Sequence, residues 1–248
     1  MKTSTGRLTA GQWAPALALF ILMAAAITGV FLYAPRDRAM GDLQRIFYFH
    51  VASAWVAFLA FGVTFGCSLG HLVSRRPAWD RRAAASAELG VLFCSVVLLT
   101  GPIWAKGAWF VYWTWDARLT TTLVLWLIYV AYLMLRILIE EPSRRALLSA
   151  VVAIAGFVNV PIVYMSIRWW RTQHPEPIIL GGEGSGMDPR MLQVFLFCLV
   201  TFTALYAYLF SRRTRLAAAM DALDALHRKI QILSLRSAAK PENCGLEE

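Results

Sequence analysis

Long apolar runs separated by short charged or proline-containing segments dominate the chain. The runs 13–33, 46–73 and 151–167, for example, contain no Asp, Glu, Lys or Arg. About 20 consecutive apolar residues are enough for a helix to cross the hydrocarbon core of a bilayer. The pattern therefore predicts six membrane-spanning helices, at about 13–33, 46–73, 83–103, 119–139, 146–167 and 191–210.

Composition agrees with this pattern. Of the 248 residues, 58% are apolar and 16% are charged, whereas about a quarter of the residues in a soluble domain are charged. We predict an all-α, polytopic membrane protein in which residues 1–210 form one membrane domain. Residues 211–248 form a tail that is partly an amphipathic helix.

The apolar side chains of this tail fall on one stripe at helical spacing. Such a helix extends the sixth span, lies on the membrane or docks on a partner, and the sequence leaves these three possibilities open. The stripe consists of Leu216, Met220, Leu223, Leu226, Ile230 and Leu233.

The distribution of Lys and Arg predicts the orientation. The two termini and the segments 74–82 and 136–145 carry 16 of them, whereas the segments 34–45, 104–118 and 168–190 carry eight. Because cytoplasmic segments are enriched in Lys and Arg, both termini are predicted in the cytoplasm. The net charge of +9 reflects this bias rather than a surface for nucleic acid, which gathers its charges on one soluble face.

The segment predicted outside, about 104–118, is rich in tryptophan and reads W-A-K-G-A-W-F-V-Y-W-T-W-D-A-R. Tryptophans commonly form belts at the membrane interface, but a belt distributes its rings over many helix ends. A single connection with this much ring area favours a platform for a flat apolar ligand. If 108–116 is helical, then Trp109, Tyr112, Trp113 and Asp116 share one face.

Two of the four histidines are predicted at the outer side, one on each side of this segment. His50 lies about one turn inside the second span, and His174 follows the fifth. Each alone is more often a structural or solvated residue than a ligand. As a pair they suit a planar metal macrocycle held axially from two sides, since imidazole is a common axial ligand of haem iron. His71 and His227 are predicted at the inner side.

Charged residues close the outer segments. Asp116 is placed to cap the fourth span, a role that can coexist with ligand binding. Arginine guanidinium groups pair well with carboxylates, such as the two propionates of haem. Four arginines are predicted at the outer face: Arg45, Arg118, Arg168 and Arg171.

The tryptophan-rich segment resembles the WWD signature of the haem-handling proteins of cytochrome c biogenesis. Within that superfamily the chain resembles cytochrome c maturation protein C, also called the heme exporter protein C family. The resemblance covers nearly the whole chain, including F-Y-F-H-V in the second span, V-N-V-P-I-V-Y in the fifth and W-W-R-T-Q-H after it.

The resemblance implies specific roles for the residues that match the family's motifs. His50 and His174 match its two axial haem ligands, and Arg45 and Arg118 match basic residues beside the haem. The platform is matched by Trp104, Trp109, Trp113, Trp115 and Asp116, with Tyr112 standing where many relatives have tryptophan.

The resemblance also implies a function and partners. The family holds haem b at the outer face of the bacterial inner membrane and presents it to a periplasmic haem chaperone. It works with a small one-span subunit and an ABC transporter, and it is not an enzyme. The segment 175–189 has no counterpart that we match, and its role stays open.

Three other functions compete with this interpretation. A membrane cytochrome of the b type requires histidines at matching depth on two helices, whereas His50 and His71 lie at opposite ends of one. A permease that moves haem or another solute through its own core usually shows intramembrane charges or broken helices, and Asn159 with Pro161 provides only a mild break. The third alternative is a scaffold without haem, anchored by its tryptophans.

Overall fold

The computed structural model describes residues 10–174 and 187–238, and every regular element in these ranges is a helix. Six segments of the described chain are long and apolar enough to cross a membrane, which confirms the predicted all-α polytopic fold. The elements are α1 (Ala10–Thr28), η1 (Gly29–Tyr33), η2 (Asp42–Arg45), α2 (Ile46–Ser74), α3 (Pro77–Trp109), α4 (Ala117–Leu138), α5 (Pro142–Phe157), α6 (Asn159–Trp169) and α7 (Pro189–Ala238).

The third helix is longer at both ends than the predicted span 83–103. It begins at Pro77, a favourable first helical residue, and it continues through Gly101 and Pro102 to Trp109. Proline removes only one backbone donor, and a helix packed against neighbours tolerates this loss inside a membrane. Hydropathy marks the apolar part of a helix, so it did not reveal these polar or glycine-containing turns.

The fifth span consists of two helices in line. α5 ends at Phe157 and α6 begins at Asn159, with Val158 between them. Pro161 lacks the N–H that would continue the helical ladder at this point. The Asn159 side chain donates to the carbonyl of Thr121 in α4 at 2.9 Å, so a neighbouring helix supports the break that the sequence suggested.

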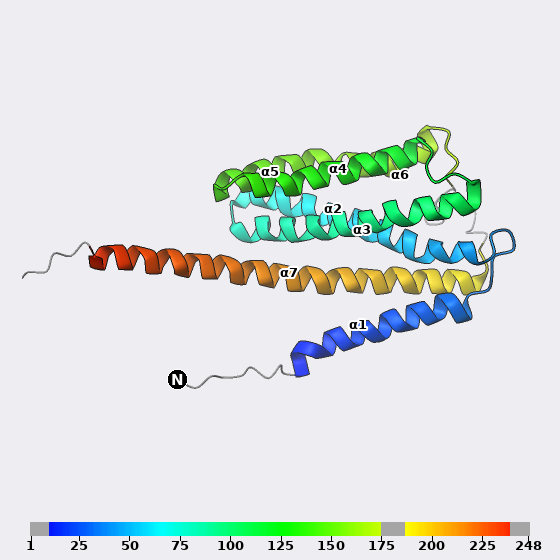
Figure 1. Cartoon of the computed structure of the whole chain (residues 1–248), viewed down its shortest axis with the longest axis horizontal. Helices are drawn as coiled ribbons and strands as arrows, with labels where there is room; N and C mark the ends of the chain where they lie inside the picture. The colour runs from blue at the N-terminus through cyan, green and yellow to red at the C-terminus, as the bar shows by residue number, and fades with distance from the viewer. Residues whose placement is uncertain (1–9, 175–186, 239–248) are drawn as a thin grey trace, which may run out of the picture.

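The tail does not fold separately from the sixth span. α7 runs without interruption from Pro189 to Ala238, and Figure 1 shows it projecting beyond the rest of the bundle. The tail is therefore a helical extension of the sixth span, and its contact with the membrane or with a partner stays a prediction.

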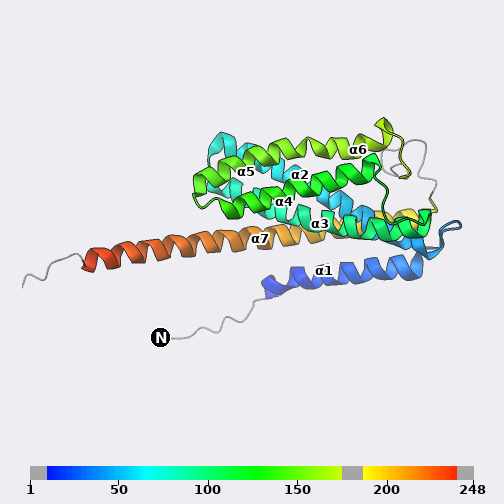
Figure 2. The ribbon, with the colours of Figure 1, turned by 45° about the horizontal axis from the view of Figure 1, so that its top comes forward.

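The other membrane helices are arranged on two sides of a central pair. α2 and α3 lie side by side in the middle, with α4, α5 and α6 on one side and α7 on the other (Figures 1 and 2). α1 packs against α7 at the edge of the bundle. The first described residue of α1 and the last of α7 lie toward the same end of the bundle (Figure 1), as an even number of spans requires.

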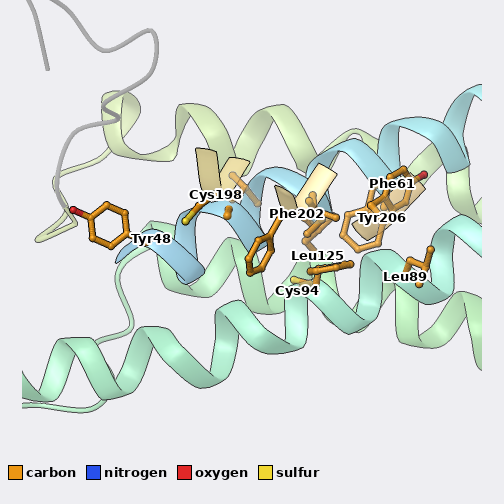
Figure 3. Packing of buried hydrophobic residues seen from close by; sticks show 14 of the residues in the cluster. Tyr48, Phe61, Leu89, Cys94, Leu125, Cys198, Phe202 and Tyr206 are labelled. Carbon is orange, nitrogen blue, oxygen red and sulfur yellow. The ribbon is translucent and has the colours of Figure 1, made fainter. Parts of the chain in front are cut away.

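The buried core is made of aromatic rings and small residues (Figure 3). Phe61 of α2 stacks on Tyr129 of α4 with ring centroids 3.8 Å apart. A Cβ at Gly90 would lie 2.5 Å from the Phe61 ring, so this close approach of α2 and α3 requires glycine. Ser86 donates to the carbonyl of Ala60 at 2.7 Å, and its oxygen lies 2.7 Å from the hydroxyl of Tyr206.

The bundle has two chemically different ends. We call the signature end the one where η2 leads into α2, α3 connects to α4, and α6 terminates. We call the tail end the opposite one, where α2 connects to α3 and α4 to α5, and where α7 projects (Figure 1).

Candidate functional site

The tryptophan-rich segment occupies the signature end and is only partly helical. Trp104 and Trp109 belong to the last turns of α3, and the helix stops at Phe110, whose φ of 65° is left-handed. Residues 110–116 form no helix. The helical face predicted for 108–116 is therefore wrong beyond Trp109, because the left-handed residue at 110 turns the chain away from the axis of α3.

The indole rings associate in edge-to-face pairs instead. Trp104 and Trp109 have centroids 5.0 Å apart at 84°, and Trp113 and Trp115 have centroids 5.6 Å apart at 77°. Trp169 and Trp170, at the end of α6, form a third pair at 5.8 Å. Edge-to-face packing is a favourable arrangement of aromatic rings.

Much of this ring surface is exposed. Trp115 is 76% exposed and Tyr112 is 61% exposed. Trp113 is half-buried, and its indole N–H has no acceptor within reach among the described residues. Buried donors in proteins are nearly always hydrogen-bonded. This N–H is therefore suited to donate to an acceptor atom of a bound ligand.

His50 lies in the second turn of α2 and contacts α3. Its Nδ1 is 2.9 Å from the hydroxyl oxygen of Thr100, and a Cβ at Gly101 would lie 3.3 Å from its Cε1. His50 and His174 are 124 positions apart in the sequence, and both lie at the end of the bundle that carries the tryptophans.

His174 is connected to the signature through Asp116. One carboxylate oxygen of Asp116 accepts from the backbone N–H of Leu119 at 3.0 Å, which confirms the predicted N-cap of α4. The other oxygen accepts from the hydroxyl of Thr172 at 3.0 Å. The Thr172 oxygen in turn accepts from the backbone N–H of His174 at 3.1 Å, so Asp116 both caps a helix and holds the segment that carries this histidine.

Arg45 and Arg118, two of the four predicted arginines, bond to groups at the signature end. Arg45 donates to Asp42 at 2.8 Å and to the carbonyl of Val30. Arg118 donates to the carbonyls of Val163 and Tyr164 at 2.7 and 3.2 Å, which ties the start of α4 to the end of α6.

The other two predicted arginines, Arg168 and Arg171, are exposed at the end of α6. All four arginines therefore lie at the signature end, and their pairing with ligand carboxylates stays a prediction.

A cavity of about 500 Å³ opens near the same end. Its lining includes Arg45, but neither histidine and none of the tryptophans. It is lined by Phe31, Arg36, Asp42, Arg45, Ile46 and Phe49. We therefore base the candidate site on the two histidines and the aromatic rings rather than on this cavity.

The remaining histidines are far from the site. His71 lies at the tail end of α2, where its Nδ1 is 3.4 Å from the carbonyl of Arg76. His227 is exposed on the projecting part of α7. Only the pair predicted from the sequence gathers at the signature end.

Known proteins resemble the chain over most of its length. The family model described as Heme exporter protein C matches residues 3–229. Heme exporter protein C of Bradyrhizobium diazoefficiens is 36% identical over 84% of this chain and 76% of its own length. The protein of that name from Escherichia coli K12 is 31% identical over 82% and 81%. A mitochondrial protein of Marchantia polymorpha, named for cytochrome c biosynthesis, is 31% identical over 73% and 77%.

The chain belongs to the heme exporter protein C family. The match to the family model begins before α1 and ends within the projecting part of α7, so it includes all six spans and the signature. This confirms the resemblance inferred from the tryptophan-rich segment.

In this member of the heme exporter protein C family, two threonines at the site were missed by sequence reasoning. Thr172 stands two residues before His174, a spacing typical of a hydroxyl that bonds nearby backbone, so the sequence contains a weak local signal for it. Thr100 is 50 positions from His50, and only the packing of α2 on α3 shows that the two side chains meet.

Proposed function

We propose that this protein binds haem b between His50 and His174 at the signature end of the bundle. The observation that carries the proposal is that two histidines distant in the sequence lie at the same end of the bundle as the exposed indole rings. Haem iron already has four porphyrin nitrogens as ligands, so two imidazoles from the protein complete its coordination. The name of the family and the role named for the Marchantia relative support haem handling for cytochrome c maturation.

The aromatic residues would provide the surface against which the macrocycle packs. Exposed rings such as Trp115 and Tyr112 offer flat apolar area at the same end of the bundle as the histidines. The indole N–H of Trp113, which has no acceptor among the described residues, and the arginines at the same end offer donors for propionate oxygens. The chemistry of these side chains fits haem, which is flat and apolar with acidic groups at one edge.

We further propose that the signature end faces the periplasm and that both termini lie in the cytoplasm. The excess of Lys and Arg in the tail-end segments supports this orientation. In this arrangement the protein sits in the bacterial inner membrane and presents haem to a periplasmic haem chaperone. It works as a non-enzymatic component beside a small one-span subunit and the subunits of an ABC transporter.

An absorption spectrum of the purified protein tests haem binding. A Soret band with the features of six-coordinate low-spin iron is expected when the protein is purified or supplied with haemin. Protein that binds haemin no better than a membrane protein of similar size without this site would refute the proposal and favour a scaffold.

Reporter fusions test the orientation separately. A reporter that is active only outside the cytoplasm should be active when inserted at Gly184 and silent when fused after Glu248. The opposite pattern would place the site in the cytoplasm and remove the case for presentation to a periplasmic chaperone.

A further inference from the structure

The Thr100 hydroxyl contacts the ring of His50 with its oxygen, because its hydrogen is already used. This hydroxyl donates to the carbonyl of Val96, one turn earlier in α3, at 2.7 Å. Its oxygen lies 2.9 Å from Nδ1 of His50. Since a hydroxyl has one hydrogen and two lone pairs, the imidazole N–H is the donor in this contact and the Thr100 oxygen is the acceptor.

The neighbouring glycine limits the position of the same ring. A Cβ at Gly101 would lie 3.3 Å from Cε1 of His50, which is closer than most Cβ contacts, so the ring packs directly on the backbone of α3. α2 and α3 lie side by side in the centre of the bundle (Figure 1). The imidazole is therefore oriented by two adjacent residues on a rigid helix, one through a hydrogen bond and one through close packing.

We propose that Thr100 is a positioning residue that holds His50 in the tautomer with its proton on Nδ1, leaving Nε2 free to ligate haem iron. This inference rests on the proposed function, in which His50 is an axial ligand. A ligating histidine needs a lone pair on the nitrogen that faces the metal. A partner for the other N–H fixes the tautomer and the ring orientation, and it raises the basicity of the ligand. Thr100 acts through His50 rather than on haem itself.

The test compares two substitutions of Thr100 in purified full-length protein titrated with haemin. Thr100→Val keeps the shape of the side chain but removes the acceptor, so we expect haemin affinity to fall by roughly tenfold or more. The midpoint potential of the bound iron should rise, because a less basic ligand stabilises ferric iron less well. Thr100→Ser keeps the hydroxyl and should bind haemin with an affinity and potential close to those of the unmodified protein.

Thr214→Val is the matched control. The Thr214 hydroxyl donates to the carbonyl of Phe210 at 2.7 Å, as that of Thr100 does to Val96, but Thr214 lies toward the tail end on α7. Its replacement should leave both the affinity and the potential unchanged. A general effect of removing a threonine from a helix would appear in both variants.

Failure of this inference is distinguishable from failure of the proposed function. If His50→Ala leaves the haemin spectrum unchanged, His50 is not a ligand and the proposed function fails. If His50→Ala alters the spectrum while Thr100→Val matches Thr100→Ser in affinity and potential, only the role of Thr100 is overturned.

Two further variants complete the design. Should Thr100→Val fail to accumulate in the membrane, Thr100→Ala also lacks the acceptor and is expected to show the same loss of affinity and rise in potential. Adding Thr100→Val to His50→Ala should produce no further change, because Thr100 acts through the imidazole. A further loss in that double variant would contradict the proposal.

Discussion

The two ends of the helical bundle use polar side chains in different ways. At the tail end, charged residues connect different helices in pairs: Arg136 of α4 to Asp80 of α3 at 2.6 and 2.9 Å, and Arg213 of α7 to Glu88 of α3 at 2.6 and 2.7 Å. At the signature end, Arg45 bonds within its own turn to Asp42, and Arg118 bonds to backbone carbonyls.

This difference separates structural from ligand-binding chemistry. These two tail-end ion pairs neutralise their own charges and join α3 to α4 and to α7. The signature end instead presents exposed rings and a buried indole N–H without an acceptor among the described residues. These rings and this N–H are available to a ligand.

The largest effect on haem binding is expected when one of the two histidines of the signature end is replaced. His50→Ala and His174→Ala should each abolish the six-coordinate low-spin spectrum of bound haem and impair formation of c-type cytochromes, because each removes one axial ligand. Protein abundance in the membrane should not change.

His71→Ala and His227→Ala are the matched controls, since both histidines lie away from the signature end. Their spectra should equal that of the unmodified protein. A low-spin spectrum that survives in the double variant of His50 and His174 would contradict the axial assignment.

The second-largest effect is expected on protein stability, when an ion pair at the tail end is disrupted. The side chains of Arg136 and Asp80 are only 14% and 15% exposed, and removing one partner from a buried pair typically costs about 3 kcal/mol or more. Arg136→Ala should therefore lower the thermal stability of the purified protein while haem bound per folded molecule stays constant. The double variant Arg136→Met with Asp80→Leu should be more stable than Arg136→Ala. A loss of haem from folded Arg136→Ala protein would show that the two ends are coupled.

The third effect asks whether the indole rings are a platform or an anchor. Loss of a large aromatic contact with a macrocycle should weaken haem retention by about 1–3 kcal/mol. Trp113→Ala and Trp115→Ala should show this loss, and the corresponding Phe variants should show less of it. Trp13→Ala, on α1 at the tail end, should have little effect on haem. If the cluster variants lose abundance but keep haem in proportion to protein, the tryptophans are anchors.

The smallest expected effect concerns the contact chain from Asp116 to His174. Asp116→Asn keeps an oxygen for the N-cap of α4. Toward Thr172 it presents either an NH2 group, which cannot accept a hydrogen bond, or an amide oxygen, which accepts more weakly than a carboxylate. Haemin affinity should fall several-fold, corresponding to about 1 kcal/mol, with little change in stability.

Thr172→Val should reproduce the effect of Asp116→Asn, and the double variant should be no worse than either single one, because both act on the same contact. Additive losses would mean that Asp116 contributes to haem binding by a separate route.

Much of this architecture follows from local sequence properties. The six spans were predicted from apolar runs because a helix that faces lipid must be apolar over the thickness of the bilayer. Their ends were less predictable. α3 extends to Pro77 and Trp109, and the charges near its start, such as Asp80 and Glu88, are stabilised by arginines from α4 and α7. Hydropathy of one segment contains no information about such partners.

For the candidate site, too, some features follow from the sequence and others only from the tertiary structure. Its residue types, the two outer histidines, the tryptophan-rich segment and the capping Asp116, were determined by the sequence, since chemistry depends on side-chain identity and a cap on local spacing. The tertiary structure alone decided that Thr100 lies against His50 and that Asp116 accepts from Thr172. These contacts join residues that are 50 and 56 positions apart. Only the packing of whole helices, which depends on every buried side chain at once, brings them within hydrogen-bonding distance.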